Sequence, residues 1–304
     1  MNQAKVYNFM GLRKYALAFS IFLLLSSLIS LSIQGLQLGL DFTGGTQVEV
    51  GYQVPAEVEK LRGQLESNGF EKPIVVHFGS DRDVLIRLQG TPEQGLSDLV
   101  YKALQSHGET VELRRVDYVG PQIGEELRED GGLGMLAALI MVMLYIAMRF
   151  QLKFSIGAVL ALAHDVIITL GFFSVTQLEF DLTVLAAILA VIGYSLNDTI
   201  VVSDRIRENF RKIRDTAAAE IINESLSQTL WRTLNTSFTT MLVLISLFFL
   251  GGELIHNFAI ALMVGVTIGT YSSIYVAATV MLAMNIDRED LLVPEKGELV
   301  DDLP

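Results

Sequence analysis

One aspartate lies inside an apolar stretch of this sequence. Asp198 belongs to the run Leu182–Val202, which is long enough to cross a membrane. A charge near the middle of a bilayer costs about 2.5–3.5 kcal/mol on insertion scales, so such residues tend to face protein or water and to have a function. Burial and a neighbouring guanidinium act on a carboxyl group in opposite directions, so a small movement can make it bind or release a proton. Asp198 is therefore a candidate proton carrier.

Polar residues at helical spacing accompany Asp198 on its own span and on the next one, Thr233–Leu250. The two spans are joined on one side of the membrane, so Arg232 can lie beside Asp198, and Tyr194 lies one turn before Asp198 on the same face. The supporting polar candidates are Tyr194, Asn197, Thr236, Thr239 and Thr240. Two interpretations stay open: a proton relay, or a buried Asp–Arg pair that only orients two helices.

A second polar pair, His164 and Asp165, lies in the span Phe154–Thr176. It is either a hydrogen-bonded structural pair or a further part of a proton path. Asn197 also has two equally supported interpretations: it makes a hydrogen bond between helices, or it is a functional group. Gly265 and Gly269 form a small-xxx-small motif, which predicts close helix packing.

The composition indicates a membrane protein and excludes several kinds of site. Hydrophobic residues make up 51% of the 304, and the mean hydropathy is +0.45. A net charge of -12 argues against nucleic-acid binding. The absence of cysteine excludes disulfides and thiol chemistry, and the four histidines show no metal-ligand spacing. No phosphate loop or Ser-His-Asp set occurs, so we expect neither an enzyme nor a cofactor.

Six apolar runs predict six transmembrane helices. The first, residues 15–33, favours a retained signal-anchor over a cleaved signal peptide because it is too long for a signal core. The others are Gly134–Met148, extended back to Gly131, Phe154–Thr176, Leu182–Val202, Thr233–Leu250 and Phe258–Met284. The charged segment 203–232 predicts one or two amphipathic helices on the membrane surface. We therefore expect a five-helix bundle over 131–284 and a tail over 285–304.

The polar region 36–130 between the first two spans predicts a small α+β domain. Strands are expected at Thr46–Tyr52, Pro73–Phe78, Val84–Leu88 and Thr110–Asp117, and helices at Pro55–Asn68 and Pro92–His107, with a turn at Gly79–Asp83. The order βαββαβ is the ferredoxin-like pattern. No catalytic constellation is visible there.

Basic residues predict the orientation. Lysine and arginine gather before the first span, between the second and third, in 203–232 and after the sixth, whereas the short loops near 177–181 and 251–257 hold none. Residues 1–35 comprise the N-terminus and the first span. The positive-inside rule places this N-terminus in the cytoplasm, the α+β domain outside the cytoplasm and the C-terminus inside.

Several motifs together resemble the SecF proteins of the SecD/SecF family, which is related to the resistance-nodulation-division transporters. The resemblance runs in order from about residue 5 to 290. The matching motifs are Leu40–Thr46, Val119–Pro121, Ala163–Val166, Gly193–Val201, Asp204–Asn209, Thr239–Thr240, Gly251–Gly252 and Gly269–Ile274.

The resemblance implies a role in protein export across the bacterial inner membrane. It implies pairing with SecD, each partner supplying six spans of a pseudo-symmetric unit, beside the SecY, SecE and SecG channel with YajC and YidC. Such a unit uses the proton gradient to help preproteins complete their passage after the ATPase SecA. Asp198 and Arg232 match residues that the family links to proton transport, and His164 and Asp165 match a further motif.

Two other functions stay open. The chain could be half of a transporter that exports a small molecule or lipid, which needs a large apolar pocket. It could also be a non-conducting scaffold of the export complex. Physics gives independent support for a partner, because six spans alone would leave a polar stripe facing lipid.

Overall fold

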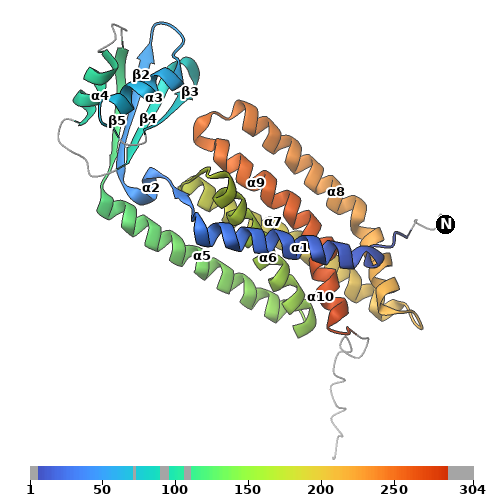
Figure 1. The fold of residues 1–304 in the computed structure, drawn as a ribbon. Helices are drawn as coiled ribbons and strands as arrows, with labels where there is room; N and C mark the ends of the chain where they lie inside the picture. The colour runs from blue at the N-terminus through green and yellow to red at the C-terminus, as the bar shows by residue number, and fades with distance from the viewer. Residues whose placement is uncertain (1–5, 71–72, 90–95, 106–110, 287–304) are drawn as a thin grey trace, which may run out of the picture.

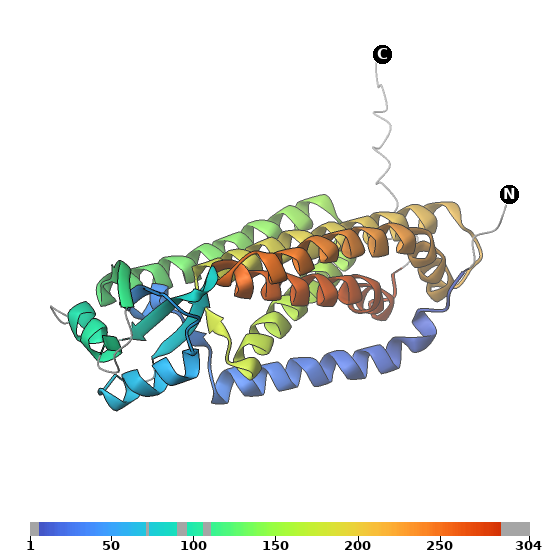
Figure 2. The same ribbon diagram turned by 90° about the horizontal axis from the view of Figure 1, so that it is seen from above.

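The computed structural model describes residues 6–70, 73–89, 96–105 and 111–286 and consists of a helical bundle with a small α/β domain at one end (Figure 1). Six of its helices are long and apolar enough to cross a membrane, as the sequence predicts. The start of α1 and the end of α10 lie at the end of the bundle away from the α/β domain (Figure 2). Parts of the predicted helix Pro92–His107 and of the tail 285–304 lie outside the described residues.

The α/β domain has the predicted ferredoxin-like topology. Its elements are β2 (Gly45–Tyr52), α3 (Val58–Ser67), β3 (Ile74–Phe78), β4 (Ser80–Gln89), α4 (Leu96–Gln105) and β5 (Val111–Val119). The antiparallel sheet has the order β3-β4-β2-β5, and Val48 pairs with Ile86 of β4 and Val116 of β5. Alternate residues of β2 point into a core that α3 and α4 complete, with Leu61 and Leu65 fully buried.

The connection between β3 and β4 is tighter than predicted. Ser80–Asp83, expected within a turn, belong to β4, because Gly79 adopts φ +79° and reverses the chain in one step. Ser80 Oγ donates to Asp83 Oδ2 at 2.8 Å, which supports this start of the strand.

Short elements join the domain to the bundle. β1 (Gln37–Leu38) pairs in parallel with β6 (Glu179–Phe180), and α2 (Leu40–Thr43) follows β1. Gly44 has φ +71°, and a Cβ there would lie 2.8 Å from the Pro121 Cα atom. Glycine is therefore required where the chain enters the domain beside the first residue of the next span.

The bundle consists of long helices around a buried centre. They are α1 (Arg13–Ile33), preceded by the turn η1 (Met10–Leu12), α5 (Pro121–Arg149), α6 (Leu152–Thr176), α7 (Leu182–Lys212), α8 (Ala218–Leu250), α9 (Glu253–Ser272), the π-helix η2 (Ser273–Ala277) and α10 (Ala278–Ala283). α6, α7 and α9 form the interior. In the most apolar stretch of each outer helix, only 6% of the residues of α5 and 11% of those of α8 are buried. These two helices therefore leave wide apolar surfaces uncovered by this chain.

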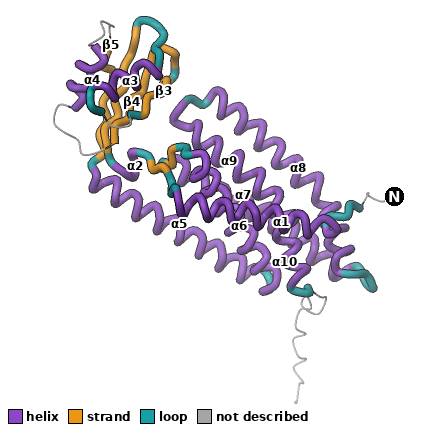
Figure 3. The backbone as a smooth tube through the Cα atoms, viewed as in Figure 1, coloured by secondary structure: helices purple, strands orange, loops and turns teal. Residues whose placement is uncertain are grey.

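Four of the spans differ from the sequence prediction in length or continuity. α5 begins at Pro121 rather than near Gly131, since proline suits the first helical position and Gly120 before it is extended. The segment 203–232 does not form separate helices: it continues α7 and α8, which are joined only through 213–217 (Figure 3). The sixth span contains the π-helical turn η2 rather than one regular helix.

Candidate functional site

Asp198 lies in the middle of α7 and is buried against α8. Its side chain is 4% exposed, and its Oδ2 atom has no hydrogen-bond partner among the described residues. Thr233 of α8 is 1% exposed, and its hydroxyl, which has no other partner among the described residues, faces the Asp198 carboxylate. A buried carboxylate oxygen without a donor is costly, so this position is poised to take up a proton or a water-borne donor.

Arg232 is the cation whose charge acts on Asp198. It is exposed on α8, next to Thr233, and the two charged side chains form no salt bridge in the described part of the chain. The structure thus brings the two predicted residues into one electrostatic site without locking them together. Asp198 and Arg232 therefore do not form a direct ion pair in this conformation.

A chain of hydroxyl groups joins three helices beside Asp198. The Tyr194 hydroxyl donates to Ser237 Oγ of α8 at 3.1 Å, and Ser237 Oγ lies 2.6 Å from Thr270 Oγ1 of α9. Ser237 Oγ also donates to the Thr233 carbonyl oxygen at 2.8 Å. Tyr194, a predicted supporting residue, therefore belongs to the polar layer next to the carboxylate.

Asp165 forms a second and fully buried carboxylate site between α6, α7 and α9. Its Oδ1 atom lies 2.9 Å from His164 Nδ1, and its Oδ2 atom accepts from Ser195 Oγ at 2.5 Å and Ser272 Oγ at 2.7 Å. His164 Nε2 is buried and has no hydrogen-bond partner among the described residues. A Cβ at Gly269 would lie 3.1 Å from the Ser195 Cβ atom, so the small residue allows α9 to approach α7 closely beside this site.

One turn of α7 connects the two carboxylate sites. Ser195 holds Asp165 and lies three residues before Asp198, so both positions share a helix face. A change at one carboxylate can therefore reach the other through a single turn of one helix.

The remaining predicted residues do not reach either carboxylate in this chain. Asn197 and Thr239 are exposed, and the hydroxyls of Thr236 and Thr239 donate to carbonyl groups of α8 itself. Thr240 is half-buried. Together with Arg232 they form a polar stripe on the outside of the bundle.

Sequence reasoning missed Thr233, Ser237, Thr270 and the role of Ser272. Single serine and threonine residues are common in apolar helices, where they bond to their own backbone. The available signal was that Thr233 and Ser237 lie four residues apart, so they share one face of α8.

The described residues contain no group of three or more His, Asp or Glu side chains placed to hold a metal ion. The polar sites above consist of single carboxylates with hydroxyl, imidazole and guanidinium neighbours. Such groups can carry a proton.

Comparisons with known proteins agree with this architecture. The model of the C-terminal region of the protein export membrane proteins SecD/SecF matches residues 99–287, and the SecD/SecF GG motif matches residues 29–56. The protein translocase subunit SecF of Vibrio alginolyticus is 50% identical over 307 residues, covering 99% of this chain and 98% of that protein. The subunit SecF of Pseudomonas aeruginosa is 52% identical over 300 residues, covering 98% of this chain.

A solved structure shares the fold. The crystal structure of SecDF, a translocon-associated membrane protein from Thermus thermophilus, superposes with a TM-score of 0.81 at 38% identity and covers 92% of this chain. This chain spans 39% of that longer protein. The motifs, the six-span bundle with its ferredoxin-like domain and these relatives lead to one conclusion: the chain belongs to the SecD/SecF family of protein-export membrane proteins.

Proposed function

We propose that the chain is the proton-carrying half of an accessory unit of Sec-dependent protein export, in which Asp198 binds and releases the proton and Arg232 controls its charge. The observation that carries the proposal is the buried Asp198 carboxylate with an unpartnered oxygen, beside an arginine that does not close onto it. A carboxylate in this state can change protonation when water or the guanidinium moves.

Asp165 has a different part in this proposal. Its carboxylate is held by His164, Ser195 and Ser272, so it stabilises the contact of α6, α7 and α9 and relays movement of α7. A direct place for Asp165 and His164 in the proton path is the further possibility that the buried, unpartnered His164 Nε2 supports.

The other half of the unit is a SecD partner. This chain matches 39% of the longer SecDF protein, which leaves room in that protein for a second half and supports this pairing. The exposed polar stripe around Arg232 requires a cover of protein rather than lipid. A twelve-span unit supplies it.

The same relationship supports a proposed setting for the unit. The six apolar helices belong in the bacterial inner membrane, with both termini in the cytoplasm and the α/β domain in the periplasm. There the unit works beside SecY, SecE and SecG with YajC and YidC, and it promotes preprotein movement on the periplasmic side after SecA. This role needs no enzymatic step and no cofactor besides the proton gradient.

The small-molecule alternative has less support. The apolar cavity between α1, α6 and η2 has a volume of about 190 Å³. Ligand pockets typically have volumes of about 300–1,000 Å³. The cavity of about 370 Å³ at the junction with the α/β domain is lined by five charged residues, namely Asp41, Arg87, Asp117, Glu179 and Asp181.

Inverted membrane vesicles that contain this chain with SecD test the proposal through preprotein export, measured with and without a proton gradient. Asp198→Asn should abolish the gradient-dependent increase, because an amide cannot take up and release a proton, while SecD still co-purifies. The control is Glu220→Gln, an exposed carboxylate in the first turn of α8. Full gradient dependence in Asp198→Asn would contradict the relay, and loss of SecD binding would indicate a scaffold.

A further inference from the structure

A charged pocket lies where α5 and α7 end, at the end of the bundle away from the α/β domain. Its volume is about 330 Å³. The lining residues are Arg149, Asp204, Arg207, Glu208, Arg211 and Lys212. Four of these six side chains are basic, so the pocket carries an excess of positive charge.

Apolar packing directly below the pocket holds the two helices in place. Ile146 of α5 is fully buried in the same cluster as Val202 and Ile206 of α7. Arg149, three residues after Ile146, then reaches Asp204 at 3.7 Å. The basic groups therefore come from two helices whose separation is set by the core, rather than from one helix surface.

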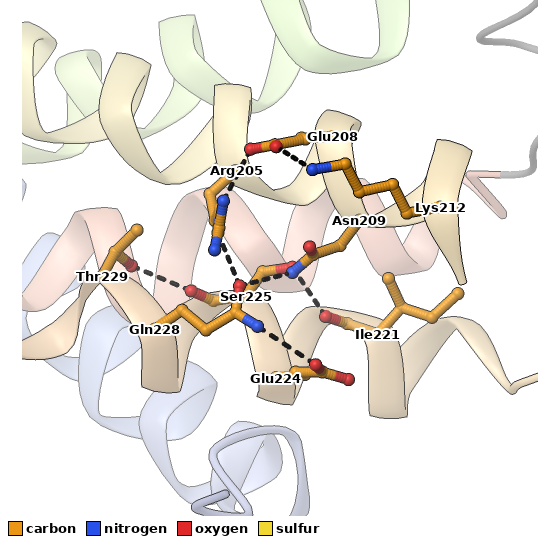
Figure 4. A network of polar contacts seen from close by, with 9 residues as sticks. All are labelled: Arg205, Glu208, Asn209, Lys212, Ile221, Glu224, Ser225, Gln228 and Thr229. Atoms are coloured by element: carbon orange, nitrogen blue, oxygen red, sulfur yellow. Dashed lines mark hydrogen bonds and ion pairs between the residues drawn. The ribbon is translucent and has the colours of Figure 1, made fainter. Parts of the chain in front are cut away.

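The acidic residues of the pocket are already engaged. Glu208 accepts from Arg205 at 2.6 Å and from Lys212 on its other side, as Figure 4 shows, and Asp204 pairs with Arg149. The half-buried Arg207 makes no hydrogen bond or ion pair with any described residue. The Arg207 guanidinium therefore has donors available for an anionic group that enters the pocket.

The surface next to the pocket is apolar and faces outward. Met148, which precedes Arg149, is 88% exposed, and Leu144, one turn earlier, is 57% exposed. A ligand whose anionic group enters the pocket can therefore lay hydrocarbon along α5. This combination of a basic pocket above an apolar helix surface fits a phospholipid better than a free ion or an acidic protein segment.

We propose that this pocket binds the phosphate of an anionic phospholipid, with Arg207 and Arg149 as the main contacts and the acyl chains on α5. Guanidinium groups donate in a planar pair that matches phosphate oxygens. The lipid would link the end of α5 to the end of α7, nine residues beyond Asp198. The inference depends on the membrane-spanning bundle and not on the proton role.

Thermal unfolding of the full chain in a neutral detergent tests this inference. Dioleoyl-phosphatidylglycerol, dioleoyl-phosphatidylcholine and inorganic phosphate are each titrated separately. We expect a saturable rise of Tm with phosphatidylglycerol alone. Arg207→Gln should raise the half-saturating concentration about fivefold, the effect of one basic residue near an anionic lipid surface. Arg214→Gln, in the neighbouring loop and outside this pocket, is the control with the same loss of charge.

Native mass spectrometry of retained phosphatidylglycerol provides a second readout that does not depend on the starting stability of a variant. Equal lipid retention by wild type and Arg207→Gln would overturn the proposal. A rise of Tm with inorganic phosphate alone would show an ion site instead of a lipid site. If Arg207→Gln lost SecD from the purified complex while lipid retention stayed unchanged, the pocket would bind an acidic protein segment and the proposal would be wrong.

Discussion

The two buried carboxylates of the bundle differ in how completely they are hydrogen-bonded. Asp165 has a partner on both oxygens, whereas Oδ2 of Asp198 has none among the described residues. A buried carboxylate with several donors is held in one position, whereas one with an oxygen that lacks a donor can take a new partner there. At the scale of single residues, Asp198 is therefore the stronger candidate for proton exchange, and Asp165 for anchoring.

The anchoring role of Asp165 can be tested at Ser272. Ser272→Ala removes one of the donors to Oδ2 and leaves a fully buried carboxylate less well paired. We expect the free energy of unfolding to fall by about 1.5–3 kcal/mol, the range for a hydrogen bond to a charged group. Denaturation in detergent measures the loss. Thr267→Ala, which removes an exposed hydroxyl that bonds only to its own helix, should change stability much less.

At the scale of elements, hydropathy predicted the six spans and alternation predicted the ferredoxin-like sheet. Hydropathy did not predict where α5 and α8 begin or where α7 ends. The apolar run stops at the membrane border, whereas the helix continues beyond it. Asp181, whose side chain accepts from the Val184 amide at 2.9 Å, fixes the start of α7 at the expected residue. The far end of α7 is polar but still helical, so its change in composition predicts a break that the structure does not have.

The candidate site was predictable only in part for a related reason. Asp198, Arg232 and Asp165 stand out because charge is rare in apolar spans. Thr233 and Ser237 do not, because hydroxyl residues are common there. Their importance depends on which face of α8 meets α7, and this is set by packing that one sequence does not encode locally.

The contact of α7 with α9 depends on Gly265. A Cβ at this position would lie 2.1 Å from Val191 Cγ2. We expect Gly265→Ala to destabilise the bundle by about 1–3 kcal/mol, the cost of overpacking. The control is Gly134→Ala on α5, where no atom lies within 4 Å of the added Cβ; the higher helix propensity of alanine should leave it as stable as wild type or more so. Equal melting temperatures of the two variants would contradict the packing argument.

An ion pair joins the α/β domain to the bundle. Arg87 Nη1 of β4 lies 2.5 Å from Glu179 Oε2 of β6, with 12% and 10% of the two side chains exposed. Burial raises the pKa of Glu179 above its ordinary value of 4.5, and Arg87 opposes this shift. Because the pKa is raised, the stability that Glu179 contributes is fully present below about pH 4.5 and is lost as the pH rises through the folded-state pKa.

Arg87→Gln should therefore destabilise the junction in a pH-dependent way. Without the guanidinium, burial acts unopposed and the pKa of Glu179 rises further, so the charged form at pH 8 is left unpaired. We expect a loss of about 1–3 kcal/mol at pH 8 and a smaller loss near pH 4.5. Thermal unfolding of wild type and variant at both pH values gives the difference. Arg115→Gln, which breaks the exposed pair with Asp117, should show little loss at either pH.

At the scale of the whole molecule, one side of the bundle is built like an interface. Small residues of α7 lie exposed at helical spacing, namely Ala186, Ala190 and Gly193, followed by the polar Asn197. Small residues let a second helix approach closely within a membrane, and polar side chains bond across such a contact. This stripe, rather than the apolar remainder of the surface, is where we expect the SecD half to pack.

Gly193→Leu separates this interface from the fold of the chain itself. A Cβ at Gly193 meets no atom within 4 Å, so the variant should unfold at the same temperature as wild type. A leucine there would hold a partner helix away, so we expect co-purification of SecD to fall several-fold and gradient-dependent export to fall with it. Gly63→Leu, at another open glycine in the α/β domain, is the control for a bulky exposed side chain. Unchanged SecD recovery with Gly193→Leu would place the partner on a different face, and the apolar surfaces of α5 and α8 would then be the ones to test.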